Sequence, residues 1–310
     1  MVNRPEALDG PSGRGGGRRQ CRQVPRLINV LSSIISLSGA LILVIVLTSS
    51  CGRESDILQP PVIIGFATDK PGVTYRDPET GQRSGFDISL SRWLADFADE
   101  PFVPVETDLV VRLREQGLQR TDEGRLDLVI SSYTITSQRE MEVDFAGPYM
   151  ETQQGVMVRS DDPRTITNPS QLAGKSVCAE ASSTSIRELR QIPGVIVIEE
   201  TGLLACINSL LAKQIDAVST DQILLYGYAR TNEDLRIEPD VRFGAIQQYG
   251  IGIPPEDGTE SCELLNSYVS RFISSGVWDT AFEANFGRDL PREQFKPSPR
   301  TCVADSEESN

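Results

Sequence analysis

Residues 176–221, SVCAEASSTSIRELRQIPGVIVIEETGLLACINSLLAKQIDAVSTD, decide the fold class of this chain. Short apolar runs rich in β-branched residues alternate here with longer segments whose apolar residues recur at helical spacing. The expected strands are 176–179, 195–198 and 215–219, and the expected helices between them are 183–190 and 203–213. Strands that alternate with helices are typical of parallel sheets, so this stretch predicts an α/β fold.

The same alternation occurs before this stretch, and further elements follow it. Before it we expect strands at 62–66, 103–105 and 126–130 and helices at 85–97 and 112–122. After it we expect an extended segment at 244–253 and helices at 260–274 and 278–286. The two α/β blocks are separated near residues 153–160, which predicts two α/β lobes. The acidic, proline-containing tail after Leu290 is expected to be poorly ordered, apart from the part that Cys302 holds.

The first 50 residues have the pattern of a targeting segment. Arginine-rich polar residues precede an apolar run without charge from Leu27 to Leu47, and Thr48-Ser49-Ser50-Cys51 follows. These regions in this order predict a signal peptide over 1–50. The small residues before Cys51 resemble a bacterial lipobox, in which this cysteine carries the lipid, for example palmitate. The run is also near the ~20 residues that span a bilayer, so a retained membrane helix is the alternative.

Either anchor tethers the folded part to the outer face of the membrane, with residues 51–59 as a linker. Four further cysteines, Cys178, Cys206, Cys262 and Cys302, would then lie in an oxidising compartment. We predict the disulfides Cys178–Cys206 and Cys262–Cys302, because each pair falls within one predicted structural unit. Four buried free thiols are the alternative.

Composition and charge exclude several function classes. The net charge of −14 repels polyanions, so we expect no nucleic-acid partner. The chain contains no histidine, which removes histidine-based general-base catalysis, histidine-activated nucleophiles and histidine-ligated metal sites. We therefore expect no catalytic residues, no metal and no cofactor, and a protein that is not an enzyme.

Short motifs that occur in order along the chain carry a resemblance to a known family. They are Gly85–Ile88, Asp127–Ile130, Thr134–Arg139, Val143–Tyr149, Leu172–Lys175, Ser183–Ser185, Ala217–Asp221, Tyr249–Ile253, Gly276–Trp278 and Asn285–Gly287. The chain resembles the family 3 extracellular solute-binding proteins, which serve ABC importers of polar amino acids. The similarity covers roughly residues 60–288 and, with the Cys178/Cys206 pair, is greatest to glutamate-binding lipoproteins of high-GC Gram-positive bacteria.

The resemblance implies a fold of the periplasmic-binding-protein-like type II, in which two α/β lobes joined by two hinge strands close over a ligand. The implied hinges lie near 155–159 and 245–250. The implied parts are 60–154 plus 250–290 for lobe one, 160–244 for lobe two and 291–310 for the C-terminal tail.

The resemblance also assigns the two residues that grip the backbone of an amino-acid ligand. Arg139 matches the arginine that binds the ligand carboxylate, a task that suits the planar fork of a guanidinium. Asp221 matches the aspartate that binds the ligand ammonium. The alternatives are a surface Arg139 paired with Glu140 or Glu142, and an Asp221 that caps the helix starting at Ile223.

Two further groups of residues are expected at the ligand backbone. Ser132 and Thr134 align with a loop that offers backbone groups and a hydroxyl in this family. Ser183, Thr184 and Ser185 begin a helix in lobe two, whose free N–H groups suit a carboxylate. A plain N-cap is the alternative for this serine-threonine cluster.

Two cations are candidates for the side-chain end of the site. Arg114 resembles an arginine of acidic-amino-acid receptors, and Lys70 follows the first strand. With Arg139 and against Asp221 they would give the site surplus positive charge, which favours glutamate or aspartate. A neutral ligand such as glutamine would leave a buried cation unpaired. The alternative is that Arg112 and Arg114 are solvated.

Taken together, these features predict an extracytoplasmic, lipid-anchored solute-binding protein. It would capture a small amino acid, glutamate or aspartate before glutamine, and deliver it to the permease of an ABC importer. A sensor that reports amino acids to a membrane signalling partner is one alternative. A dehydratase-like enzyme on the same fold is another.

Overall fold

The computed structural model describes residues 61–98, 102–106, 118, 126–255, 258–298 and 300–302. All of them belong to one compact unit, Gly52–Asn310. The predicted signal peptide, Cys51, Arg114 and most of the expected helix at 112–122 lie outside the described residues. Those predictions stay predictions.

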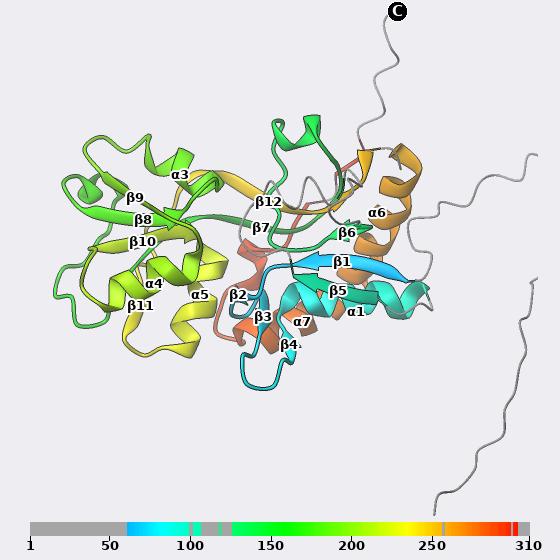
Figure 1. The fold of residues 1–310 in the computed structure, drawn as a ribbon, viewed down its shortest axis with the longest axis horizontal. Coiled ribbons are helices and arrows are strands. Elements are labelled where there is room, and N and C mark those ends of the chain that lie inside the picture. Colours follow the sequence, from blue (N-terminus) through cyan, green and yellow to red (C-terminus); the bar gives the residue numbers. More distant parts are fainter. Residues whose placement is uncertain are drawn as a thin grey trace, which may run out of the picture. The chain divides into compact units, whose positions relative to one another are not determined.

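One mixed sheet forms the centre of the described fold (Figure 1). Its strands are β1 (Val62–Phe66), β5 (Phe102–Glu106), β6 (Leu128–Val129), β7 (Asp144–Arg159), β8 (Ser176–Glu180), β9 (Ile196–Glu200), β10 (Ala217–Asp221), β11 (Leu235–Ile237) and β12 (Phe243–Ile253). They follow the order β5-β1-β6-β12-β7-β10-β8-β9, and β11 also pairs with β7. The long antiparallel pair β7 and β12 therefore joins two groups of strands.

We call these two groups, with their helices, the β1 side and the β8 side (Figure 1). The β1 side has β1, β5 and β6 with α1 (Phe86–Ala98), α6 (Gly258–Ser274), α7 (Val277–Phe286) and a small sheet of β2 (Asp69–Lys70), β3 (Thr74–Arg76) and β4 (Arg83–Ser84). The β8 side has β8, β9 and β10 with α3 (Thr184–Leu189), α4 (Leu203–Leu211) and α5 (Gln222–Thr231). The described 3₁₀ helices are η2 (Arg139–Met141), η3 (Pro169–Leu172) and η5 (Arg292–Gln294).

The predicted α/β class is confirmed by the way these strands pair. Strand β8 pairs in parallel with both β9 and β10, and β1 pairs in parallel with both β5 and β6. All five residues of β10 are buried, as expected for a strand between neighbours in a covered sheet. The lobe boundaries expected from the family resemblance stay predictions.

Two features of the strands were not predicted from the sequence. Strand β7 continues through Thr152 and Gln154, which are buried polar residues that interrupt an apolar pattern. Its length comes from pairing partners far away in the chain, β10, β11 and β12. The small sheet of β2, β3 and β4 consists of strands of two or three residues, too short for any periodicity to appear.

The expectation of a poorly ordered tail after Leu290 is wrong for its described part, residues 291–298 and 300–302, which we call the C-terminal strap. Phe295 in the strap is only 1% exposed. Its ring meets Tyr226 of α5 and Phe282 of α7, and its carbonyl accepts from the backbone N–H of Glu151 at 2.9 Å. A single aromatic residue in an otherwise polar segment thus anchors the strap by burying its ring.

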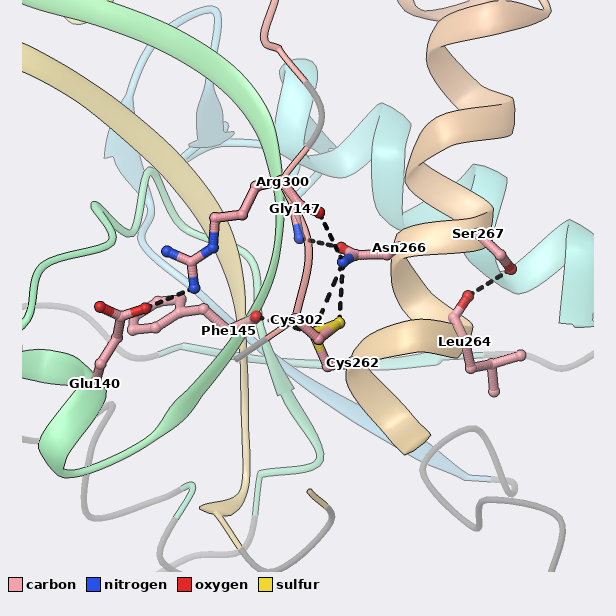
Figure 2. The surroundings of a disulfide bond; sticks show 9 residues. All are labelled: Glu140, Phe145, Gly147, Cys262, Leu264, Asn266, Ser267, Arg300 and Cys302. Carbon is pink, nitrogen blue, oxygen red and sulfur yellow. Dashed lines mark hydrogen bonds and ion pairs between the residues drawn. A yellow bond between two sulfur atoms is a disulfide. The ribbon is translucent and has the colours of Figure 1, made fainter. Parts of the chain in front are cut away.

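The four cysteines pair as predicted. Cys178–Cys206 joins β8 to α4 with 5.5 Å between the Cα atoms, and Cys262–Cys302 joins α6 to the strap with 5.9 Å. Figure 2 shows Asn266 of α6 beside the second disulfide, where its Nδ2 donates to the carbonyl of Arg300 at 3.3 Å. The disulfide and this hydrogen bond hold the end of the strap against α6.

Candidate functional site

Arg139 occupies a buried position at the start of η2, before β7. Its side chain donates from Nη1 to the carbonyl oxygen of Thr134 at 2.7 Å and lies over the ring of Tyr133, 4.8 Å from the centroid. Only 9% of the residue is exposed. Glu140, one of the surface partners considered from the sequence, pairs instead with Arg300 at 2.5 Å. The burial favours the ligand role over a solvated arginine.

Asp221 ends β10 and has a carboxylate that is held on both oxygens. Tyr249 of β12 donates its hydroxyl to Oδ2 at 2.6 Å, and Gln154 of β7 donates Nε2 to Oδ1 at 2.6 Å. The residue sits at the N-cap position of α5, but its side chain makes no capping hydrogen bond. The alternative role as a helix cap therefore finds no support in its side-chain contacts.

The electrostatics of Asp221 are dominated by its burial. Burial raises the pKa of the Asp221 carboxyl from 3.8 to about 6. The hydrogen bonds from Tyr249 and Gln154 and the charges of Lys70 and Arg139 act in the opposite direction on that pKa. Both predicted cations therefore favour the ionised form of the Asp221 carboxyl.

Lys70 at the end of β2 points into the same region. Its Nζ donates to Ser132 Oγ at 3.3 Å and forms an ion pair with Oε2 of Glu180 at 3.5 Å. The two charged side chains are 5% and 18% exposed. Glu180 is the last residue of β8 and was not among the site residues predicted from the sequence. An acidic residue at the carboxyl end of a predicted parallel strand is the signal that could have identified it.

Ser132 and Thr134 lie in a loop that β12 holds in place. Thr134 forms a bridge with Tyr249, and Gly250 donates its N–H to the carbonyl of Tyr133 at 2.9 Å. The backbone N–H of Ser132 donates to Oδ2 of Asp87 at 2.7 Å. The two residues predicted to contact the ligand therefore sit on a loop fixed by backbone and carboxylate hydrogen bonds.

The cluster Ser183–Ser185 begins α3 as predicted, and its side chains behave differently from ordinary caps. Ser183 is the N-cap residue, yet its hydroxyl makes no capping hydrogen bond. That Oγ is buried and has no hydrogen-bond partner within the described residues. Ser185 Oγ donates to Thr220 Oγ1 at 3.4 Å, which places the cluster beside the residue that precedes Asp221.

The structure brings most of the predicted site residues together and adds three. Lys70 contacts Ser132, both cations act on Asp221, and the serine cluster contacts Thr220. The added residues are Glu180, Gln154 and Tyr249. Arg114 lies outside the described residues. The carboxyl ends of the parallel strands β8 and β10 supply Glu180 and Asp221, which is where open α/β sheets carry their ligands.

The described site carries no surplus of positive charge. Two cations, Lys70 and Arg139, face two carboxylates, Asp221 and Glu180. The predicted surplus of positive charge is therefore not found among the described site residues. No cluster of metal-ligating side chains occurs in the part of the chain that the structure describes.

Comparison with known proteins shows the family to which the chain belongs. The sequence profile of the bacterial extracellular solute-binding proteins, family 3, matches residues 62–288. The chain belongs to this family. Its fold is the type II fold of periplasmic amino-acid-binding proteins.

Two curated relatives have named ligands. The glutamate-binding protein GluB of Corynebacterium efficiens is 29% identical over 239 residues, which cover 74% of this chain and 79% of the relative. The glutamine-binding protein of Geobacillus stearothermophilus is 30% identical over 210 residues, which cover 66% and 77%.

Two solved structures extend the comparison. An ancestral arginine-binding protein with bound arginine is 27% identical with a TM-score of 0.64, over 73% of this chain and 98% of that one. An ancestral amino-acid-binding protein, a precursor of cyclohexadienyl dehydratase, is 23% identical with a TM-score of 0.64, over 73% and 95%. The second likeness concerns the fold alone. Among the helices described for this chain, none has the length and apolarity that a bilayer span requires.

Proposed function

We propose that this protein captures an acidic amino acid outside the cytoplasm and delivers it to an ABC importer. The observation that carries the proposal is that two buried residues of opposite charge, Arg139 and Asp221, are connected through Thr134 and Tyr249. A free amino acid carries a carboxylate and an ammonium on one carbon, and this pair matches both groups.

Arg139 is the group that binds the ligand carboxylate. A guanidinium has five N–H donors, and the hydrogen bond to the carbonyl of Thr134 fixes its orientation. Two donors on one edge can then bind both oxygens of a carboxylate at once. Ser183 Oγ, buried without a partner among the described residues, and the N–H groups at the start of α3 are further donors for that carboxylate.

Asp221 is the group that binds the ligand ammonium. Its two oxygens offer about four acceptor positions, and Tyr249 and Gln154 occupy one on each oxygen. The remaining positions accept the ammonium without the loss of either hydrogen bond. This arrangement binds any α-amino acid, so the side chain of the ligand must be selected elsewhere.

Glutamate or aspartate is the proposed ligand, with glutamine as the nearest competitor. Lys70 is the described cation for the ligand side chain, and Arg114 is a second candidate from the sequence. Relatives that bind glutamate and glutamine are similar to this chain at 29% and 30% identity. Both ligands have side chains of the same length, so the selection between them depends on charge.

Location and movement complete the proposal. Residues 1–50 act as a signal peptide, and Cys51 carries the lipid that anchors the protein to the outer face of the membrane. The ligand is enclosed when the two lobes close about hinges near 155–159 and 245–250. The permease of the importer then receives the closed, loaded form.

A thermal-shift screen of the full-length protein in mild detergent against the twenty amino acids tests the proposal. A ligand that binds only the folded state raises the melting temperature. We expect the largest shifts with glutamate and aspartate, followed by titration calorimetry with one site per chain. Stabilisation by none of the twenty would refute amino-acid capture, and stabilisation by glutamine alone would refute the acidic ligand.

A further inference from the structure

The ion pair between Lys70 and Glu180 joins the two sides of the sheet at the ligand site. Lys70 comes from β2 on the β1 side, and Glu180 ends β8 on the β8 side. Their charged atoms are 3.5 Å apart, and Lys70 also donates to Ser132, one of the predicted ligand contacts. The cation proposed for the ligand side chain is therefore already paired with a carboxylate of the protein.

We propose that Glu180 determines how strongly the site discriminates between an anionic and a neutral ligand side chain. This inference rests on the proposed function, because it concerns the side-chain end of the same site. Glu180 neutralises Lys70, so a neutral side chain can be enclosed without an unpaired cation. An anionic side chain must instead share Lys70 with Glu180.

Burial makes this competition strong. The side chains of Lys70 and Glu180 are 5% and 18% exposed, so water screens their charges weakly. Removal of one member of a buried ion pair leaves the other uncompensated, which is costly. If Glu180 loses its charge, the carboxylate of a glutamate ligand becomes the natural partner of Lys70. The amide of glutamine cannot take that role.

Close packing around the pair fixes its position. The hydroxyl of Tyr228 in α5 donates to the carbonyl of Asp69, the residue before Lys70. Gly227 in the same helix lies so close to Pro71 that a Cβ atom would come within 1.8 Å of its carbonyl oxygen. The segment Asp69–Pro71 is thus held on both flanks of Lys70. These contacts fix the backbone of Lys70 against α5, and its side chain stays within reach of Glu180.

The opposing explanation is that the ion pair only holds the two sides of the sheet together. A purely structural contact would change the affinity for every ligand by the same factor. A selective contact changes the ratio of the affinities for glutamate and glutamine, which have nearly the same shape and differ in charge. The ratio therefore separates the two explanations.

The experiment measures glutamate and glutamine binding by calorimetry with full-length protein in mild detergent. Glu180→Gln should raise the preference for glutamate over glutamine at least about tenfold relative to the wild type, as expected for a change of about 1.4 kcal/mol. Lys70→Met should shift the ratio in the opposite direction. Glu199→Gln is the matched control, because Glu199 of β9 lies opposite Ala179, the residue before Glu180, and pairs with exposed Arg190.

The inference would be overturned if Glu180→Gln binds both ligands and its ratio of glutamate to glutamine affinity lies within about twofold of the wild-type ratio. If Glu180→Gln does not fold, Lys70→Met and the double variant Lys70→Met/Glu180→Gln decide. The double variant restores the balance of charge, so its ratio of glutamate to glutamine affinity must lie nearer the wild-type ratio than the ratio of Lys70→Met does. A ratio that is no nearer also overturns the inference. Wild-type protein that binds neither of these ligands nor aspartate would refute the proposed function itself, which is a distinct result.

Discussion

The hydroxyl of Tyr249 donates to Asp221 across 2.6 Å and so connects β12 directly to the end of β10. Both residues are buried, and Gln154 of β7 holds the other carboxylate oxygen. The proposed ammonium-binding group is thus oriented by residues of the two long central strands. Movement of those strands and the geometry of the ligand site are coupled through these hydrogen bonds.

Tyr249→Phe should weaken the binding of every amino acid and make that binding more sensitive to acid. The hydrogen bond from Tyr249 lowers the pKa of Asp221, so its loss raises that pKa further above the ordinary value. We expect a loss of roughly three- to tenfold at pH 8, equivalent to about 1 kcal/mol for one buried hydrogen bond, and a larger loss at pH 6. Calorimetry at both values checks this.

The control for Tyr249→Phe is Tyr268→Phe in α6 on the β1 side, whose backbone carbonyl accepts from Trp93 Nε1. An equal loss at pH 8 and pH 6 would contradict the role of Tyr249 in keeping the carboxylate ionised. Such a result would mean that Tyr249 contributes to binding only through the packing of its ring.

Asp221→Asn should abolish amino-acid binding while stabilising the ligand-free protein at pH 7.5. The folded protein holds the proton of Asp221 more tightly than the unfolded chain, because its pKa is about 6 against 3.8. The stability associated with this proton is complete below pH 4 and is lost as pH rises to about 6. Above that window the ionised carboxyl costs up to about 3 kcal/mol, which the uncharged amide avoids.

Gln154 helps the Asp221→Asn variant to keep its hydrogen bonds. Its Oε1 is buried without a partner among the described residues, so it can accept from the new amide after a flip of the glutamine side chain. Thermal unfolding with and without the substitution at pH 7.5 and pH 4.5 measures the effect. We expect a higher melting temperature at pH 7.5 and a smaller gain at pH 4.5, where only part of the cost of the ionised carboxyl remains. A variant that is less stable at both pH values would contradict this account.

Arg139→Lys should reduce the affinity for every amino acid about a hundredfold or more although it keeps the positive charge. A lysine ammonium cannot bind both carboxylate oxygens in the fixed fork geometry of a guanidinium. It also cannot donate to the carbonyl of Thr134 and to the ligand with the same orientation. Calorimetry with glutamate, aspartate and glutamine checks the prediction, with Arg242→Lys, which alters the exposed contact to Gln294, as the control. A loss confined to one ligand would show that Arg139 acts on the side chain.

The elements that could be predicted from the sequence are those with local patterns. Strands β8, β9 and β10 are short apolar runs between helices, and their order in the chain already indicates parallel pairing. Strand β7 escaped prediction because Gln154 and Thr152 are buried by partners remote in the chain. Phe295 escaped because nothing around it in sequence signals that its ring is covered by α5 and α7.

The site residues also divide into those that a local sequence pattern identifies and those that only the fold brings together. Arg139 and Asp221 stand in recognisable motifs, so their selection needed no knowledge of the fold. The pairing of Lys70 with Glu180 joins residues on opposite sides of the sheet, and no local pattern connects them. Prediction from the sequence alone therefore identified the cation and missed its counter-charge, which changed the expected charge of the site.

Removal of the Cys262–Cys302 disulfide should destabilise the protein through the C-terminal strap. The bond closes a loop with a sequence separation of 40, which corresponds to about 4 kcal/mol of constraint on the unfolded chain. Cys262→Ser/Cys302→Ser should therefore lower the melting temperature by several degrees. Phe295→Ala should reduce the free energy of unfolding by about 3–5 kcal/mol, because loss of the buried ring leaves a cavity between α5 and α7. The melting temperature should fall with it.

The combination of these substitutions tests whether the strap acts as one element. If the disulfide keeps Phe295 seated, the triple variant loses less stability than the sum of the two separate losses, because an unanchored strap has already given up part of the aromatic contact. The matched control is Lys296→Ala, which removes a neighbouring ion pair with Asp279 but leaves Phe295 and the disulfide in place. Calorimetric unfolding of the wild type, Cys262→Ser/Cys302→Ser, Phe295→Ala and the triple variant measures the coupling between the disulfide and the aromatic anchor. Strictly additive losses would show that the disulfide and the aromatic anchor hold the segment independently.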